Sequence, residues 1–381
     1  MVNQKRLRIG IFLRCGSNAI GELYYIKNVI ESLGVLEDAK KPEIILFYIE
    51  DSAPYVKEFN YEYLETRPYK PVHKYLGYFY SWLVRKNLFT SRMIAHNDLD
   101  GLFPINDTPI RTKQGKTKII SWFPDLQHKF YPQYFPRLNV ILREYRLKLL
   151  LKNTDGLVVS SQDVLSHFRK FYTLPQSLKV SVLPFISNIE KSTLEYETVR
   201  KKYGIEGQYF IVSNQFYEHK NHKVVFEAIG LLLKEGKEVQ VVFTGKFEDY
   251  KNLTFTQKLE EQIERLGIKT HIKILGIIPR EEQICLLENS IAVIQPSLFE
   301  GWSSIVEDVK TLQIPILVSD IAVHFEQLGD EGHYFKSTDS QSLANLMQEF
   351  TLKKPTKQPL YDNDHKMRTI EFANRFVDIF K

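Results

Sequence analysis

The stretch "PSLFEGWSSIVEDVKTLQIPILVSD" at residues 296–320 places a glycine-containing loop between a strand and a helix. The apolar run "IAVIQPS" predicts a buried strand, and apolar residues recur at helical spacing from Ser303 onward. In parallel α/β sheets, the loop at the carboxyl end of such a strand is a common ligand site. The loop and the helix carry three acids in nine residues, more than a helix cap requires: Glu300, Glu307 and Asp308.

Apolar strands and amphipathic helices alternate along both halves of the chain. The first half has predicted strands at residues 7–13, 42–49, 101–105, 117–123, 156–161 and 179–185. The second half has them at residues 208–214, 238–245, 272–276, 291–297 and 314–320. This alternation is typical of doubly wound parallel sheets, so the predicted fold class is α/β.

The chain has 381 residues, which is more than one hydrophobic core usually serves. A polar, charged segment from about Ser187 to Gly207 predicts a linker with a helix. We therefore expect one domain at residues 1–188, a second at residues 189–355, and a closing amphipathic helix within residues 356–381 that packs back on the first domain. Two such domains predict a ligand cleft between them.

Cysteine is scarce, with only Cys15 and Cys285, which excludes a disulfide framework and favours a reducing, cytoplasmic compartment. The basic N-terminus lacks the features of a signal peptide, and no apolar run is long enough to span a bilayer. We expect no metal or cofactor. The pair Asp98 and Asp100 precedes a predicted strand and therefore predicts a turn, as does the polar segment at Asp362.

Two basic segments contain interleaved apolar and aromatic residues. One begins at Arg67 and ends at Arg92, and it contains no acid at all. The other begins at Arg137 and ends at Lys152, with apolar residues at helical spacing. Such segments either contact an anionic membrane peripherally or pack one face in the core and expose a solvated basic face. Nothing in the sequence calls for a nucleic-acid partner.

Helix geometry separates the acids of the opening stretch. At about 100° per residue, Glu307 is expected to point into solvent, whereas Asp308 lies at the flank of the apolar stripe and is expected to face the ligand. Ser303 or Ser304 can cap the helix, and its N-terminus suits a phosphate. The alternative is that Glu300 and Asp308 are ordinary acids favoured by the helix dipole.

The stretch resembles the donor-binding signature of glycosyltransferase family 4, the retaining enzymes of GT-B fold. The family pattern has Glu, Gly, an aromatic residue and Gly or Ser, followed by a second Glu. Glu300, Gly301, Trp302 and Ser303 match the first part, and Asp308 replaces the second Glu.

Further matches lie in other strand-end loops. The segment "VSNQFYEHKNH" resembles the loop that holds the donor pyrophosphate; Lys220 matches its Lys, and Gln215 stands in place of its Arg. The resemblance implies that the backbone from Gly276 to Ile278 contacts the base. In the first half, "GELYYIKNVIESLG" starts at Gly21 and resembles the family's glycine-started first helix, near the donor phosphates.

The resemblance implies a nucleotide-diphospho-sugar as co-substrate and a glycan or lipid-linked acceptor, in surface polysaccharide synthesis. Lys220, the helix N-terminus and the hydroxyls of Ser303 and Ser304 would stabilise the leaving group without a metal. Glu300 would hold sugar hydroxyls, and Asp308 or Glu307 would hold the ribose. The remaining candidate catalytic residues follow the strand at 117–123 and would contact the sugar or the acceptor: Asp125 and His128.

Two alternatives stay open at this point. Because Gln215 and Asp308 depart from the family pattern, the protein could be a non-catalytic subunit that binds sugar nucleotides. Another GT-B enzyme, such as a nucleotide-sugar epimerase, would have the same fold and would form product without an acceptor.

Overall fold

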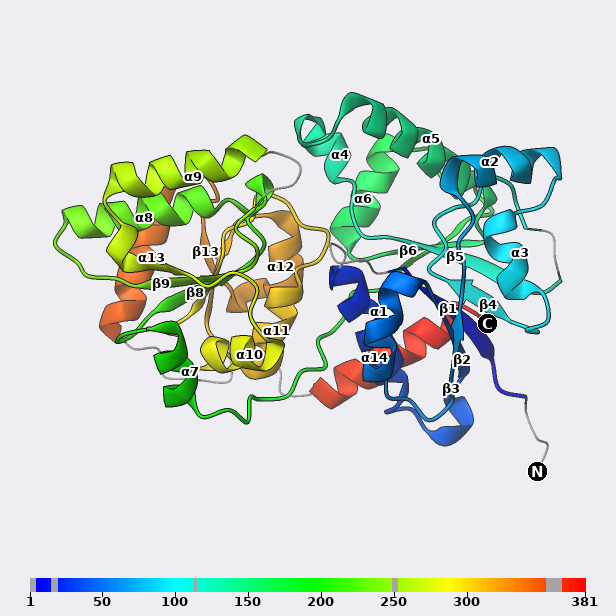
Figure 1. The fold of residues 1–381 in the computed structure, drawn as a ribbon, viewed down its shortest axis with the longest axis horizontal. Helices are drawn as coiled ribbons and strands as arrows, with labels where there is room; N and C mark the ends of the chain where they lie inside the picture. The colour runs from blue at the N-terminus through cyan, green and yellow to red at the C-terminus, as the bar shows by residue number, and fades with distance from the viewer. Residues whose placement is uncertain (1–4, 15–19, 113–114, 249–252, 354–364) are drawn as a thin grey trace. The chain divides into compact units, whose positions relative to one another are not determined.

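The computed structural model describes residues 5–14, 20–112, 115–248, 253–353 and 365–381 (Figure 1). Cys15, the predicted turn at Asp362 and the predicted domain end near residue 355 lie outside these residues. The chain forms two compact units. Unit 1 contains residues 1–188 and 364–381, and unit 2 contains residues 189–363.

Unit 1 is built on a parallel sheet of seven strands in the order β3-β2-β1-β4-β5-β6-β7. The strands are β1 (Arg8–Leu13), β2 (Glu43–Tyr48), β3 (Leu64–Pro68), β4 (Gly101–Phe103), β5 (Lys118–Phe123), β6 (Gly156–Val159) and β7 (Lys179–Val182). The helices are α1 (Ile20–Leu33), α2 (Lys74–Leu83), α3 (Leu88–Ile94), α4 (Gln127–Phe130), α5 (Arg137–Asn153), α6 (Gln162–Phe171) and the C-terminal α14 (His365–Asp378). Helix α14 packs beside α1, as predicted, and its Phe376 ring lies 5.3 Å from the ring of Phe103 on β4.

Unit 2 has a parallel sheet of six strands in the order β10-β9-β8-β11-β12-β13. The strands are β8 (Phe210–Ser213), β9 (Val241–Thr244), β10 (Ile272–Ile274), β11 (Val293–Gln295), β12 (Ile316–Ser319) and β13 (His333–Phe335). The helices are α7 (Tyr196–Tyr203), α8 (His222–Lys234), α9 (Leu253–Leu266), α10 (Arg280–Glu288), α11 (Ser304–Leu312), α12 (Ala322–Leu328) and α13 (Ser340–Lys353). Apolar residues of α8, α9 and α13 form one core cluster of unit 2, and those of α7, α10 and α11 form a second.

Short 3₁₀ helices complete the connections: η1 (Asp38–Lys40), η2 (Glu50–Glu58), η3 (Pro132–Tyr134), η4 (Glu218–Lys220), η5 (Lys269–His271) and η6 (Gly329–Glu331). Among the described residues, no helix is both long and apolar enough to cross a membrane.

The sequence reasoning missed two strands, β3 and β13, and both lie at sheet edges. Strand β3, "LETRP", has polar residues at its three central positions, because most of its side chains face solvent. The strand β13 has only three residues, too few to show a period. Central strands are buried on both faces and therefore appear as continuous apolar runs, which neither β3 nor β13 shows.

The loops at the carboxyl edge of the second sheet approach each other closely. Gly245, after β9, has φ +117°, and a Cβ there would lie 2.2 Å from the carbonyl oxygen of Asn214, after β8. Only glycine fits this position. The close contact fixes the two loops that begin the candidate site.

Candidate functional site

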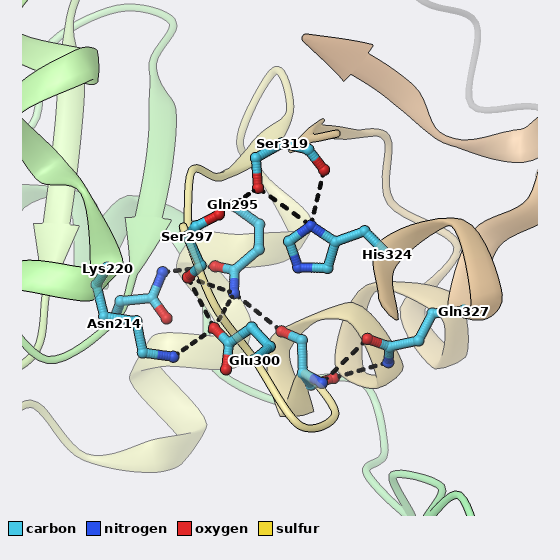
Figure 2. A network of polar contacts seen from close by, with 9 residues as sticks. Asn214, Lys220, Gln295, Ser297, Glu300, Ser319, His324 and Gln327 are labelled. Atoms are coloured by element: carbon cyan, nitrogen blue, oxygen red, sulfur yellow. Dashed lines mark hydrogen bonds and ion pairs between the residues drawn. The ribbon is translucent and has the colours of Figure 1, made fainter. Parts of the chain in front are cut away.

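The site is centred on the carboxylate of Glu300, in the loop after β11 (Figure 2). Its Oε1 atom lies 2.5 Å from the Nζ atom of Lys220, which ends η4 in the loop after β8. The hydroxyl of Ser297 donates to the same oxygen at 2.7 Å. The structure thus brings together two residues that the sequence analysis selected from segments 80 residues apart.

The two oxygens of Glu300 differ in their surroundings. All of its hydrogen bonds with described residues go to Oε1, including one from Gln295 Nε2 at 2.9 Å. The side chain is only 10% exposed, and that of Lys220 is 17% exposed. Oε2 therefore remains available to accept hydrogen bonds from ligand hydroxyls. A partly buried ion pair of this kind contributes little to stability, so exchange of partners for a charged ligand costs little.

Gln295, the last residue of β11, links the loop after β8 to the loop after β11. It is fully buried. Its Oε1 accepts from Asn214 Nδ2 at 2.6 Å, and its Nε2 donates to Ser303 Oγ at 2.9 Å as well as to Glu300. The sequence analysis did not select Gln295 or Asn214. A polar residue at the end of an otherwise apolar strand was the signal that could have identified each of them.

Helix α11 begins next to this network. Ser303, one of the two predicted capping residues, does occupy the N-cap position, but its hydroxyl accepts from Gln295 and makes no capping hydrogen bond. The backbone N–H of Ser303 donates to Gln327 Oε1 on α12 at 3.0 Å. Ser304, by contrast, is exposed. Gly301 is buried and Trp302 is half-buried in the loop before the helix.

The predicted orientation of Glu307 is wrong. Its side chain is fully buried, and Oε1 accepts from Gln327 Nε2 at 3.1 Å and lies 3.5 Å from Lys310 Nζ. Helical spacing predicts which residues share a face, but it does not show that α12 covers the polar face of α11. Glu307 therefore stabilises the contact between these helices.

Asp308 is also buried, and its Oδ2 accepts from Arg280 Nη2 at 2.6 Å. Arg280 is the first residue of α10 and donates through Nη1 to Gln283 at 2.7 Å. A guanidinium thus compensates the charge of Asp308. The sequence analysis did not identify Arg280.

Gln215 and Gly276 hold neighbouring loops together. Gln215 Oε1 accepts from the backbone N–H of Lys246 at 2.9 Å, and the carbonyl of Gly276 accepts from the N–H of Gly245 at 2.8 Å. Gly276 has φ +71°, and Ile278 packs partly buried at the edge of one core cluster. These residues line the same carboxyl edge as Lys220 and Glu300.

Two buried histidines of unit 2 stay neutral at physiological pH. Burial lowers the pKa of His324 to about 4, and Nδ1 donates to the carbonyl of Ser319 at 2.9 Å. Burial also lowers the pKa of His222 to about 3, and its ring stacks on Phe216 with centroids 4.0 Å apart. Neither residue is therefore a source of positive charge for the site.

The other candidates belong to unit 1 and are outside this network. Gly21 is exposed in the first turn of α1. Asp125 Oδ1 accepts from the N–H of Gln127 at 2.8 Å. His128 is buried, and its Nε2 lies 2.6 Å from Glu144 Oε1 on α5; burial, followed by the charge of Arg143, lowers the pKa of His128. The expected contact of Asp125 or His128 with the sugar or the acceptor stays a prediction.

Glu22, in the first turn of α1, is a titratable group that the sequence analysis did not select. Burial raises the pKa of its carboxyl to about 7, against the opposing effect of Arg14. Across the described residues, no group of three or more His, Cys, Asp or Glu side chains is placed to hold a metal ion. Asp98 and Asp100 form ion pairs with Lys116.

The fold resembles that of solved glycosyltransferases. Sucrose-phosphate synthase from Thermosynechococcus elongatus matches with a TM-score of 0.72 and 13% identity over 98% of this chain and 99% of that one. Anabaena Alr3699/HepE, solved in complex with UDP and glucose, matches with a TM-score of 0.70 and 14% identity, with the same coverage. At such identities the comparison shows the fold, and it confirms the predicted GT-B fold class.

Two curated relatives share part of the sequence. The O-antigen chain mannosyltransferase RfbU of Salmonella typhimurium (strain LT2) is 23% identical over 57% of this chain and 56% of its own length. The O-antigen chain mannosyltransferase B of Escherichia coli is 21% identical over 61% of each chain. The match thus spans less than two thirds of either relative. Residues 195–367 match the family model described as Glycosyl transferases group 1. The similarity to glycosyl transferases group 1 therefore covers residues 195–367, less than half of this chain, and lies within a GT-B fold.

Proposed function

We propose that this protein is a retaining glycosyltransferase of family 4 that moves a hexosyl group from a nucleotide-diphospho-sugar to a glycan or lipid-linked acceptor. The observation that carries the proposal is the contact between Lys220 and Glu300 at the carboxyl edge of the second sheet. It places a cation suited to a diphosphate beside a carboxylate with one oxygen available for sugar hydroxyls. The group 1 family match at residues 195–367 covers both residues.

Donor binding would exchange the partners of this pair. Lys220 would turn from Glu300 to the diphosphate, where negative charge grows as the glycosidic bond breaks. Glu300 would then accept from hydroxyls of the sugar while Ser297 and Gln295 hold its Oε1. The loop from Gly301 to Ser303 would present the N-terminus of α11 to the phosphates.

The site does not require a metal, because Lys220 and the helix N-terminus supply positive charge. In a retaining transfer of this kind, the leaving phosphate would assist removal of the acceptor proton, so no protein nucleophile is needed. The two curated relatives are named O-antigen chain mannosyltransferases, which supports a role in surface polysaccharide synthesis and a mannosyl donor. We place the reaction in the cytoplasm, at the inner face of the membrane.

The proposal is tested by thermal shift with a nucleotide-mannose, UDP-glucose and the free nucleotides, on wild type, Lys220→Ala and Lys223→Ala. Lys223 is an exposed lysine one turn away, on α8, and serves as the matched control. Ligand that binds only the native state raises the melting temperature by mass action. We expect one donor to stabilise wild type and Lys223→Ala but not Lys220→Ala. A shift that is equal in all three proteins would contradict the assigned site.

A second candidate is a non-catalytic subunit that binds sugar nucleotides. It is favoured by the contacts of two residues: Gln215, where the family has Arg, bonds the backbone of Lys246, and Asp308 is paired with Arg280. The two candidates differ in turnover. Transfer of labelled sugar to a glycan acceptor supports the enzyme, whereas stoichiometric binding with neither transfer nor donor hydrolysis supports the subunit.

A further inference from the structure

Helix α2 of unit 1 presents its large apolar residues to solvent and its small residues to the core. Gly77 and Ser81, one turn apart, are its buried residues. A Cβ at Gly77 would lie 2.5 Å from the ring of Phe89, so the helix packs closely through this small face. The exposed apolar residues are Tyr75, Leu76, Phe79, Tyr80, Trp82 and Leu83. A surface helix of a soluble domain normally has the opposite arrangement.

Helix α5, which contacts α2, also has exposed apolar residues. Leu138, Ile141 and Tyr145 are each 60–65% exposed and are spaced to lie along one face of the helix. The two helices are neighbours within unit 1 (Figure 1), since Arg146 on α5 donates to the hydroxyl of Tyr78 on α2 at 3.3 Å. We call the exposed apolar residues of α2 and α5 together the aromatic surface. Soluble proteins rarely leave so many large apolar side chains exposed without a partner, and α2 alone has six of them.

The charges around the aromatic surface are positive. Lys70, Arg85 and Lys86 are exposed beside α2, and the sequence has no acid between Glu65 and Asp98. Helix α5 adds exposed cations at Arg137, Lys148 and Lys152. Its one acid, Glu144, already accepts hydrogen bonds from His128, Lys129 and Tyr172. An occupant of this surface therefore meets apolar rings and unopposed cations.

We propose that the aromatic surface docks unit 1 onto an anionic phospholipid membrane. Trp82 and the tyrosines would lie at the level of the lipid headgroups, which amphipathic rings favour. Arg85 and Lys86 would contact lipid phosphates, and the leucines would reach the acyl chains. The absence of acids in the sequence of α2 and its flanks favours an anionic lipid surface over a protein partner, which would be expected to meet charges of both signs. This inference does not depend on the proposed transfer reaction.

Vesicle sedimentation tests the proposal. Vesicles of phosphatidylcholine with phosphatidylglycerol are expected to carry the wild-type chain to the pellet, whereas phosphatidylcholine alone carries much less. Phe79→Ala/Trp82→Ala is expected to abolish binding. Arg85→Gln/Lys86→Gln is expected to weaken it about 30-fold, since each cation near an anionic surface contributes about fivefold. Leu352→Ala is the matched control, because Leu352 is an exposed apolar residue of unit 2.

The fluorescence of Trp82 gives a readout that does not depend on sedimentation. Trp82 is 71% exposed, whereas Trp122 is 8% exposed and Trp302 is half-buried in unit 2, so the Trp82→Phe variant assigns any change on vesicle addition to Trp82. We expect a blue shift with anionic vesicles that is absent in Trp82→Phe. The proposal is overturned if anionic vesicles neither bind the chain nor shift its emission. Sedimentation velocity without lipid would then show whether a dimer that Phe79→Ala/Trp82→Ala disrupts occupies the surface instead.

Discussion

Two carboxylates, one in each unit, are surrounded by hydrogen-bond donors but use their oxygens differently. In unit 1, Glu144 accepts from His128 and Tyr172 through Oε1 and from Lys129 through Oε2. In unit 2, the described donors to Glu300 all bond Oε1. A carboxylate with both oxygens occupied holds structure together, whereas one with an available oxygen can still bind a ligand. Burial alone does not distinguish the two.

The largest effect is expected from the same substitution at both acids. In Glu300→Gln, the amide oxygen can still accept from Lys220, Ser297 and Gln295, but an NH₂ group replaces the available oxygen and cannot accept from a sugar hydroxyl. We expect a loss of about 10²–10³-fold in kcat/KM, similar to removal of a preorganised polar contact, with little change in melting temperature.

Glu144→Gln should behave in the opposite way. Both oxygens of Glu144 accept hydrogen bonds, so the new NH₂ group necessarily replaces an acceptor, and we expect a loss of about 1–3 kcal/mol in the free energy of unfolding. Specific activity of the folded protein should change little. Steady-state kinetics and thermal unfolding of both variants measure the contrast. Equal losses of activity in the two variants would remove the distinction drawn between the acids.

The second prediction concerns the lysine beside each acid. Lys220→Ala should weaken donor binding by about 10–100-fold, as loss of a charge-assisted contact to phosphate implies. Lys129→Ala should leave donor affinity unchanged and lower only stability, because Lys129 contacts Glu144. Calorimetric titration with the donor found by thermal shift measures both. Weaker binding in Lys129→Ala would show that unit 1 reaches the donor through this residue.

The third prediction concerns the connection between β11 and the site. Gln295→Leu keeps a side chain of similar length but leaves the amide of Asn214 without its acceptor and removes one donor to Glu300. We expect a loss of about 1–3 kcal/mol in the free energy of unfolding, the usual cost of an unsatisfied buried polar group. Gln341→Leu, at an exposed glutamine on α13, is the control. Chemical denaturation gives both values, and equal values would contradict the role of Gln295.

The sequence predicted the central strands, the fold class and the position of Lys220 and of Glu300 in strand-end loops, because these depend on local apolar runs and on the geometry of parallel sheets. It did not predict that the two side chains form an ion pair. It did not predict the burial of Glu307 or the ion pair between Asp308 and Arg280. These depend on how α10 and α12 pack around α11, and helical spacing within α11 carries no information about its neighbours. For the same reason, the inverted orientation of α2 required the structure.

The last prediction has the smallest effect at physiological pH, because it concerns stability in acid. The pKa of His128 in unit 1 and that of His324 in unit 2 are both lowered from an ordinary value of 6.5, first of all by burial. Below about pH 6.5, the unfolded chain therefore binds protons that the folded chain does not. The contribution of these histidines to the free energy of unfolding is at its maximum above pH 6.5 and decreases as the pH falls. For His324 the loss should continue to about pH 4, at up to about 1.4 kcal/mol per pH unit. Denaturant titrations of wild type, His128→Gln and His324→Gln between pH 7 and pH 4 measure each contribution. His324→Gln should flatten the pH dependence more, since His324 has the larger shift, and an unchanged slope in both variants would mean that these rings are already solvated in the folded protein.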